Sequence, residues 1–151
     1  MSTAWSIRPE RTGDAAAVSV VNTLAFRRRR EAWLVERLRA RASPYLGDGM
    51  ASTLMALAPM AVWPAWQGRG VGSALVREGL AACRAAGHDV VVVVGHPAYY
   101  PRFGFVRARP LGLGSDPSFP DEAFMVAELT PGALGGRRGL VVYGEEFSEP
   151  V

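Results

Sequence analysis

Residues 61–73 read AVWPAWQGRGVGS, and they join an apolar segment to the start of a predicted helix. Gly68, Gly70 and Gly72 alternate with other residues directly before that helix. Glycine lets backbone N–H groups approach an anionic oxygen closely, because it has no Cβ. The positive end of the helix dipole would add to the attraction. The stretch therefore predicts a cradle for a phosphate-bearing ligand, although a plain turn can also use such glycines.

The glycine spacing and the missing lysines exclude two common nucleotide-binding motifs. The dinucleotide pattern G-x-G-x-x-G fails, because Ser73 stands where its third glycine would fall. All 17 basic residues are arginine, so a phosphate-binding loop that ends in Gly-Lys is impossible. The same fact excludes a Schiff base on a lysine side chain. The net charge of +3 favours anionic small ligands only weakly.

The sequence around this stretch alternates between helical and extended patterns, which predicts an α/β fold. We predict strands at residues 5–9, 53–62, 90–94, 124–129 and 139–143, and helices at 15–26, 31–41, 73–86 and 98–103. The unbroken β-branched run at 90–94 is typical of a central strand that is buried on both faces. Pro59 lies inside the segment 53–62 and cannot donate to a ladder, so a bulge or local splaying is expected there.

The composition predicts one globular domain over residues 1–151. Apolar residues make up 49% of the chain and charged residues 21%. Cys83 is the only cysteine, which excludes an intramolecular disulfide and a cysteine-based metal cluster and suits a reducing compartment. The sequence has no apolar run of membrane-spanning length, and residues 1–8 lack a signal-peptide pattern. We therefore expect a cytoplasmic protein that does not bind a membrane.

Two motifs, in this order, resemble those of the GNAT N-acetyltransferase superfamily. Residues 67–72 (QGRGVG) match its Q/R-x-x-G-x-G/A signature, and residues 100–105 (YPRFGF) match its Tyr-x-x-x-Gly-Phe. The segments 95–105 (GHPAYYPRFGF) and 120–125 (PDEAFM) look like those of small bacterial members. The resemblance covers about residues 56–143.

The resemblance implies a mixed, mostly antiparallel sheet flanked by helices, and an enzyme that moves an acetyl group from acetyl-CoA to a primary amine. The amine would belong to a small molecule or a protein, and it would attack directly in a ternary complex without a metal. Loop N–H groups would hold the pyrophosphate, and one strand would pair with the pantetheine amides. The implied cofactor-binding residues are Met60, Ala61, Val62, Gln67, Gly68, Arg69, Gly70, Val71, Gly72, Ser73 and Tyr99. Tyr100 would be the general acid that protonates the leaving thiolate.

Several of these residues also have a purely structural interpretation. Tyr100 could be a core residue with a satisfied hydroxyl, and Tyr99 could simply pack or line the cofactor groove. His96 suits a side chain that orients its loop through a hydrogen bond. The basic run at residues 27–30 suits a solvated face better than a nucleic-acid contact, so no nucleic-acid partner is expected. Arg69 is the better phosphate ligand, because it lies in the glycine loop itself.

The sequence departs from the family at two places. Residues 53–62 hold no carboxylate, so waters, Asp121 or Glu122 would have to serve as the base, although both acids could equally be surface residues. Only residues 43–52 separate the second helix from the cofactor strand, which is too short for the family's two-strand hairpin. A shortened sheet would need residues 5–9 beside it, or a second chain in a homodimer. A non-catalytic acyl-CoA-binding or degenerate module is therefore the alternative.

Overall fold

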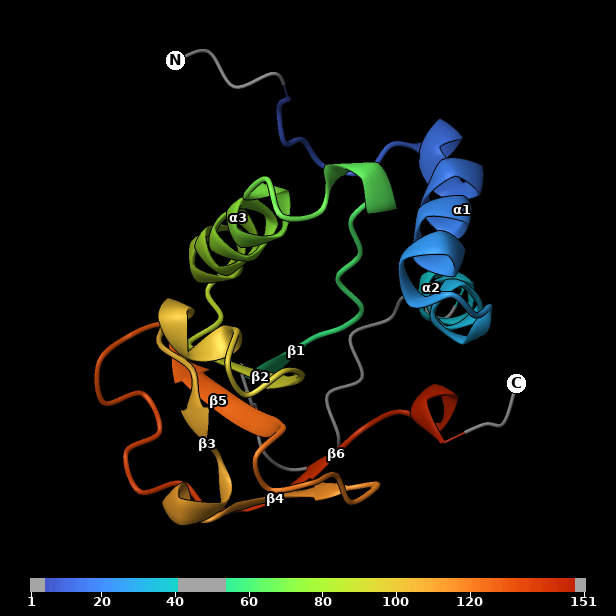
Figure 1. The fold of residues 1–151 in the computed structure, drawn as a ribbon. Coiled ribbons are helices and arrows are strands. Elements are labelled where there is room, and N and C mark those ends of the chain that lie inside the picture. Colours follow the sequence, from blue (N-terminus) through green and yellow to red (C-terminus); the bar gives the residue numbers. More distant parts are fainter. Residues whose placement is uncertain (1–4, 41–53, 149–151) are drawn as a thin grey trace. The chain divides into compact units, whose positions relative to one another are not determined.

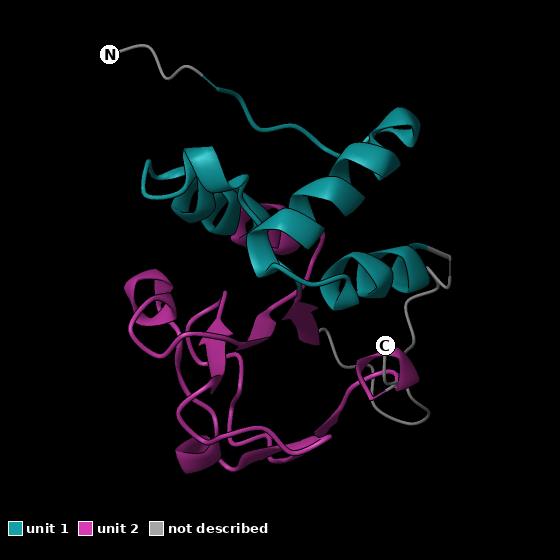
Figure 2. Ribbon diagram, turned by 45° about the vertical axis from the view of Figure 1, so that its right-hand side comes forward, with its two compact units in different colours: residues 1–42, 59–79, 151 teal, residues 43–58, 80–150 magenta. Residues whose placement is uncertain are grey.

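A computed structural model describes residues 5–40 and 54–148, which fall into two compact units (Figure 2). The helical unit comprises residues 5–40 and 59–79, and the sheet unit comprises residues 54–58 and 80–148. The expectation of a single domain stays a prediction. Within the described ranges, no helix is both long and apolar enough to cross a bilayer.

The sheet unit is built on four strands in the order β1-β2-β5-β3 (Figure 1). The strands are β1 (Leu54–Leu57), β2 (Val90–Val94), β5 (Phe124–Glu128) and β3 (Val106–Arg107). β1 runs parallel to β2, whereas β2–β5 and β5–β3 are antiparallel. The predicted mixed, mostly antiparallel α/β class is therefore confirmed.

β2 is the central strand that its composition predicts. It pairs with β1 on one side and β5 on the other, and Val90 to Val93 are each at most 1% exposed. A β-branched run fits this place because both faces of the strand are covered. Phe105 and Phe124 are equally buried in this unit.

A second sheet of two parallel strands joins β4 (Leu113–Asp116) to β6 (Gly139–Val142). β6 confirms the strand predicted at residues 139–143. β4 was not predicted, because its sequence LGSD holds a glycine and an aspartate, which are poor strand formers. Its pairing with β6 and the burial of Leu113 and Ser115 make it a strand nevertheless.

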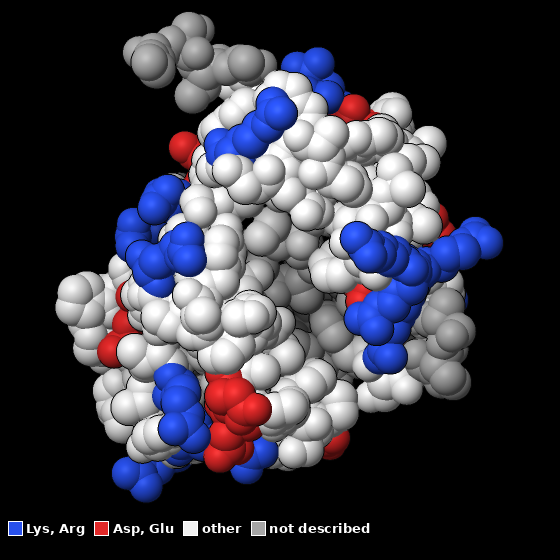
Figure 3. All heavy atoms as spheres, in the orientation of Figure 1, with Lys and Arg blue, Asp and Glu red and all other residues white. Residues whose placement is uncertain are grey.

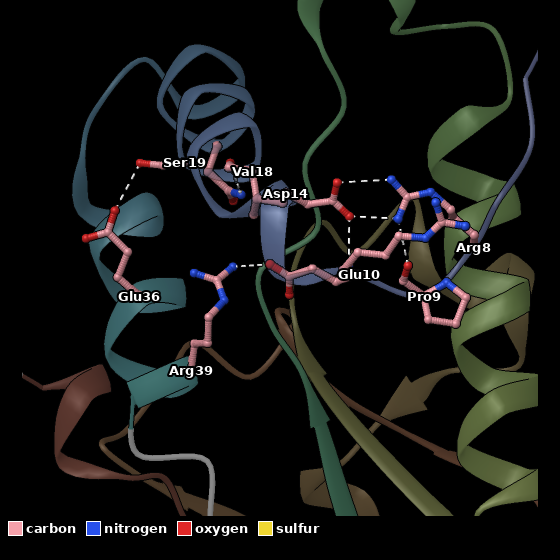
Figure 4. A network of polar contacts seen from close by, with 10 residues as sticks. Arg8, Pro9, Glu10, Asp14, Val18, Ser19, Glu36 and Arg39 are labelled. Atoms are coloured by element: carbon pink, nitrogen blue, oxygen red, sulfur yellow. Dashed lines mark hydrogen bonds and ion pairs between the residues drawn. The ribbon is translucent and has the colours of Figure 1, made fainter.

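The helical unit contains α1 (Ala15–Phe26), α2 (Arg30–Ala40) and the start of α3 (Val71–Ala85). These bounds confirm the three predicted helices to within two residues, as far as the described residues extend. Ser19 on α1 donates to Glu36 on α2 over 3.1 Å, and Arg39 on α2 forms an ion pair with Glu10 (Figure 4). These contacts tie the N-terminal segment and both helices together.

Asp14 is the polar centre of the N-terminal segment (Figure 4). The Arg8 guanidinium contacts both of its carboxylate oxygens, at 2.7 and 3.0 Å, and the Arg11 backbone N–H donates to it at 2.8 Å. These contacts, with Arg8 first, lower the pKa of Asp14 to about 2. The carboxylate therefore stays ionised over the whole physiological range.

Three predicted elements differ from the structure. Residues 5–9 form no strand, and that prediction is wrong: Arg8 is held by Asp14, and Pro9 has no N–H for a ladder. The predicted strand 53–62 is correct only for β1, which ends at Leu57, two residues before Pro59. The predicted helix 98–103 is a 3₁₀ helix at Tyr100–Phe103. Residues 43–52, the segment predicted to be too short for the family's hairpin, lie outside the described residues.

Candidate functional site

The glycine loop adopts a conformation that side chains disfavour. Gly68 has φ +72° and Gly70 has φ +82°, both in the left-handed region. Apart from the neighbouring residues in the chain, a Cβ built on either glycine would meet no atom of the described residues within 4 Å. The glycines therefore serve the backbone conformation, and the space beside them is open to a ligand.

The loop leads directly into α3, whose first residue is Val71. The Ala74 N–H donates to the Gly70 carbonyl over 3.0 Å, which starts the helical pattern. The N–H groups of Val71 and Gly72 come before this bond, so they have no acceptor inside the helix. Together with the dipole of a 15-residue helix, they form an attractive place for an anion. The backbone here is compatible with the cradle predicted from the sequence, and phosphate binding by it stays a prediction.

Gln67 fixes the start of this loop. Its side-chain amide donates to the Val62 carbonyl over 3.1 Å, and its backbone N–H donates to Pro64 over 3.3 Å. The side chain therefore holds the loop against the segment that precedes it, which is a positioning role. Direct contact of Gln67 with a ligand stays a prediction.

Residues 58–63 connect β1 to a 3₁₀ helix at Pro64–Trp66. Within the described part of the chain, this segment pairs with no strand. Met60, Ala61 and Val62 are half-buried. Their backbone groups are thus outside any ladder, as an extended ligand with amide groups would require, except that the Val62 carbonyl accepts from Gln67.

Tyr100 lies in the sheet unit, and its ring is fixed by aromatic neighbours. It is 8% exposed and makes edge-to-face contacts with Tyr99, Phe103 and Phe105 at centroid distances of 5.1, 6.4 and 5.7 Å. A Cβ on Gly95, the residue after β2, would fall 2.2 Å from its Cε2 atom. The ring therefore occupies the space that a side chain at position 95 would fill.

The Tyr100 hydroxyl can act as a proton donor. It has no hydrogen-bond partner among the described residues of the sheet unit. A purely structural role in the core would instead require that this hydroxyl be hydrogen-bonded. Burial, and secondarily the neighbouring Tyr99, raises the pKa of Tyr100. The phenol therefore keeps its proton at neutral pH and can give it to a group with greater basicity.

His96 and Tyr99 have local structural roles. The Ala98 N–H donates to His96 Nδ1 over 3.2 Å, which is the loop-orienting role expected for this histidine. The His96 carbonyl accepts from the Tyr99 N–H over 3.0 Å. The Arg102 guanidinium lies 4.6 Å from the centre of the Tyr99 ring and donates to the Tyr99 carbonyl. A cofactor contact of Tyr99 stays a prediction.

The two carboxylates considered as bases lie in the loop before β5. Asp121 forms ion pairs with Arg107, at 3.8 Å, and more closely with Arg109. These contacts favour a structural role for Asp121, while Glu122 is exposed. The Asp121 carboxylate is therefore already occupied by two arginines. Among the described residues, no group of three potential metal ligands lies together.

The predicted site residues fall in both units. The glycine loop and residues 60–62 belong to the helical unit, whereas Tyr99 and Tyr100 belong to the sheet unit. Gly95 was not predicted to matter for the site, although a glycine just before a Tyr-rich turn is a usable signal for close packing. The stacking of Arg69 on Trp66, at 5.2 Å, was not predicted either, because cation–π pairs follow no spacing rule in a loop.

Known proteins resemble this chain in sequence and in fold. The sequence model of the acetyltransferase (GNAT) domain family matches residues 33–107 of this chain. The uncharacterized N-acetyltransferase YhbS of Escherichia coli K12 is 39% identical over 106 residues, which cover 70% of this chain and 64% of YhbS. The aligned part of the chain thus spans less than two thirds of that relative's length.

Two solved structures extend the similarity to nearly the whole chain. The Escherichia coli YhbS structure in complex with CoA has a TM-score of 0.86 and 30% identity, covering 99% of this chain and 97% of that one. A GNAT family acetyltransferase from Brucella melitensis, in complex with acetyl-CoA, has a TM-score of 0.72 and 30% identity, covering 93% and 96%.

Proposed function

The chain belongs to the GNAT acetyltransferase family, and from this we propose that it transfers an acetyl group from acetyl-CoA to a primary amine. The amine belongs to a small molecule or a peptide, and it attacks directly in a ternary complex. Relatives solved with CoA and with acetyl-CoA support the choice of donor.

The observation that carries this proposal is the glycine loop before α3. Gly68 and Gly70 have positive φ, open space lies beside them, and the N–H groups of Val71 and Gly72 lack helical acceptors. These features fit a pyrophosphate. In the proposal, Gln67 fixes the loop, while Arg69, Ser73 and Tyr99 complete the binding residues.

Residues 60–62 hold the pantetheine arm in this proposal. Their backbone groups pair with its amides as a neighbouring strand would, because they take part in no ladder of the described residues. The Val62 carbonyl is partly engaged by Gln67, so Met60 and Ala61 carry most of this pairing.

Tyr100 is the proposed general acid. Acetyl-CoA, when bound, supplies a thioester whose acetyl carbon accepts the amine nitrogen while the carbon–sulfur bond breaks. The Tyr100 hydroxyl gives its proton to the departing sulfur, and the raised pKa keeps that proton in place until it is needed. Water removes the proton from the acceptor amine, because Asp121 is engaged by two arginines.

A non-catalytic acyl-CoA-binding module is the second candidate. One observation favours it: residues 54–62 offer no carboxylate that could serve as a base on the cofactor segment. Both candidates bind acetyl-CoA, so binding alone does not separate them. The expected homodimer, the absence of nucleic-acid and membrane partners, and a cytoplasmic location stay predictions under either candidate.

A turnover assay separates the two candidates. The purified full-length chain is incubated with acetyl-CoA and a panel of primary amines that includes polyamines, amino-sugar amines and peptide N-termini. Free thiol is measured against the hydrolysis rate without amine. The enzyme predicts amine-dependent thiol release and an acetylated product of increased mass. Saturable acetyl-CoA binding with no amine-dependent release across the panel would favour the binding module.

A further inference from the structure

The outer edge of β6 offers backbone groups to a partner strand. The N–H groups of Gly139 and Tyr143 donate to β4, over 3.0 and 2.9 Å, so the odd-numbered residues of β6 face β4 in this parallel ladder (Figure 1). Leu140 and Val142 therefore turn their N–H and C=O groups away from β4. Neither residue forms a hydrogen bond on that side with any residue that the structure describes. β6 thus has an open edge.

The side chains beside this edge are the most exposed large apolar ones in the described part of the chain. Leu140 is 60% exposed and Val142 is 67% exposed, and they lie two residues apart, on one face of the strand. The half-buried Val141 between them points the other way and packs against the core of the sheet unit. Proteins usually protect an open strand with a charge or a proline, and Gly139–Val142 has neither. The edge is therefore suited to pairing with another strand.

The charges around β6 are arranged so that the strand complements a second copy of itself. Two arginines precede the strand and two glutamates follow it: Arg137, Arg138, Glu145 and Glu146. Two copies that pair antiparallel about a two-fold axis through Val141 bring the basic end of each beside the acidic end of the other. In that register Leu140 lies opposite the partner's Val142, so the residues with outward backbone groups form the hydrogen-bonded pairs. Backbone, apolar side chains and charges thus agree on one register.

Arg138 has the surroundings that this pairing requires. It is exposed, and it forms no ion pair with the residues that the structure describes. Its side-chain stem packs over Gly112, where a Cβ would fall 2.7 Å from Arg138 Cγ, so the stem is held beside the strand. In the two-fold register, Arg138 lies one residue from the partner's Glu145, which is exposed at the start of a 3₁₀ helix. The two charges are therefore close enough to attract each other.

We propose that the protein forms a homodimer in which β6 pairs antiparallel with the partner's β6, in the register that is centred on Val141. The two-stranded sheet β4–β6 of each copy then joins its counterpart in one four-stranded sheet. This contact is separate from any covering of β1, which belongs to the other sheet of the unit. The inference does not depend on the proposed acetyl transfer.

Sedimentation over a dilution series, together with amide hydrogen exchange, tests this pairing on the full-length chain. The wild type is expected to be a dimer at micromolar concentration, in which the amides of Leu140 and Val142 exchange at least about tenfold more slowly than in the diluted monomer. Leu140→Glu buries two unpaired carboxylates per dimer, so it should weaken dimerisation more than about tenfold. Val106→Glu is the matched control, because Val106 is 53% exposed on β3 of the same unit, and it should leave the dissociation constant unchanged.

A charge exchange tests the register without altering the apolar residues. Arg138→Glu should weaken dimerisation about two- to fivefold, because it places a like charge beside the partner's Glu145, and adding Glu145→Arg should restore the dimer. Arg29→Glu is the matched control. It reverses a charge in the exposed turn between α1 and α2, where Figure 3 shows basic side chains gathered, and it should not change dimerisation.

Three results would each overturn the inference. The first is a wild type that stays monomeric throughout the series, and the second is a dimer in which the amides of Leu140 and Val142 exchange quickly. The third is a dimer that neither a folded Leu140→Glu variant nor Arg138→Glu weakens. Circular dichroism shows whether the Leu140→Glu variant is folded, and the charge exchange keeps the test decisive if it is not.

Discussion

Gly95→Ala tests whether the position of the Tyr100 ring is set by close packing. The new Cβ would lie 2.2 Å from Cε2, 2.8 Å from Cδ2 and 3.2 Å from Cζ of the ring. Because Gly95 does not have a positive φ, alanine brings no backbone strain of its own. The ring would have to retreat by about 1 Å or more to reach an ordinary contact distance of about 3.5 Å.

The ring has little room for that movement, because Tyr99, Phe103 and Phe105 surround it. Overpacking of this kind costs about 1–3 kcal/mol. For a chain of this length, that corresponds to a fall in Tm of about 2–12 °C. Because the ring moves, we also expect kcat to fall.

Urea unfolding measures the free energy directly, and Gly79→Ala is the matched control. Gly79 lies inside α3 with no atom within 4 Å of a built Cβ, so alanine there should stabilise the chain by about 0.5–1 kcal/mol. A second comparison places Gly95→Ala in a Tyr100→Leu background, where most of the cost should vanish. An unchanged unfolding free energy in Gly95→Ala, or the same cost in both backgrounds, would refute this packing account.

Four further predictions follow from other parts of the structure. Tyr100→Phe should lower kcat about ten- to a thousandfold while stability and acetyl-CoA affinity stay the same, and an unchanged kcat with chemistry rate-limiting would make the tyrosine a packing residue. Gly70→Asp should abolish the rise in Tm that acetyl-CoA causes, whereas Gly87→Asp, which has φ +89° after the other end of α3, should retain it. Asp14 has a lowered pKa of about 2, so its contribution to stability is present above about pH 4 and is lost as the pH falls towards 2; Asp14→Asn should remove that part of the acid sensitivity, as urea midpoints at several pH values will test. The outer edge of β1 should be covered in a homodimer, so light scattering should find a dimer at micromolar concentration with slow hydrogen exchange at Leu54–Leu57, and fast exchange in a monomer would contradict this.

The helices and buried strands could be predicted because their patterns are local. α1 follows cap residues and is itself an Ala/Val-rich run, and its bounds at Ala15–Phe26 agree with the prediction. β2 is an unbroken valine run, which only a central strand explains well. The glycine-rich start of α3 was also predicted, because it lies directly before a helical pattern, and Gly68 and Gly70 there have the left-handed φ that glycine favours. Phosphate binding by this loop stays a prediction.

The predictions that were wrong concern segments whose structure depends on partners distant in the sequence. Residues 5–9 alternate like a strand, but the structure satisfies Arg8 through Asp14 instead. β4 has a sequence that disfavours strands and becomes one only through its pairing with β6. The stacking of Arg69 on Trp66 and the approach of Gly95 to Tyr100 are spatial facts that follow no periodicity.

The central claim is that the loop before α3 holds the pyrophosphate of acetyl-CoA through its backbone N–H groups, and amide NMR tests it directly. The ¹⁵N-labelled full-length chain is titrated with acetyl-CoA while the amide resonances of Gly70, Val71 and Gly72 are followed. We expect these amides to move downfield by the largest amounts in the chain and to saturate together, because each gains a charged acceptor. Saturable binding that leaves these three amides unmoved while others shift would contradict the claim.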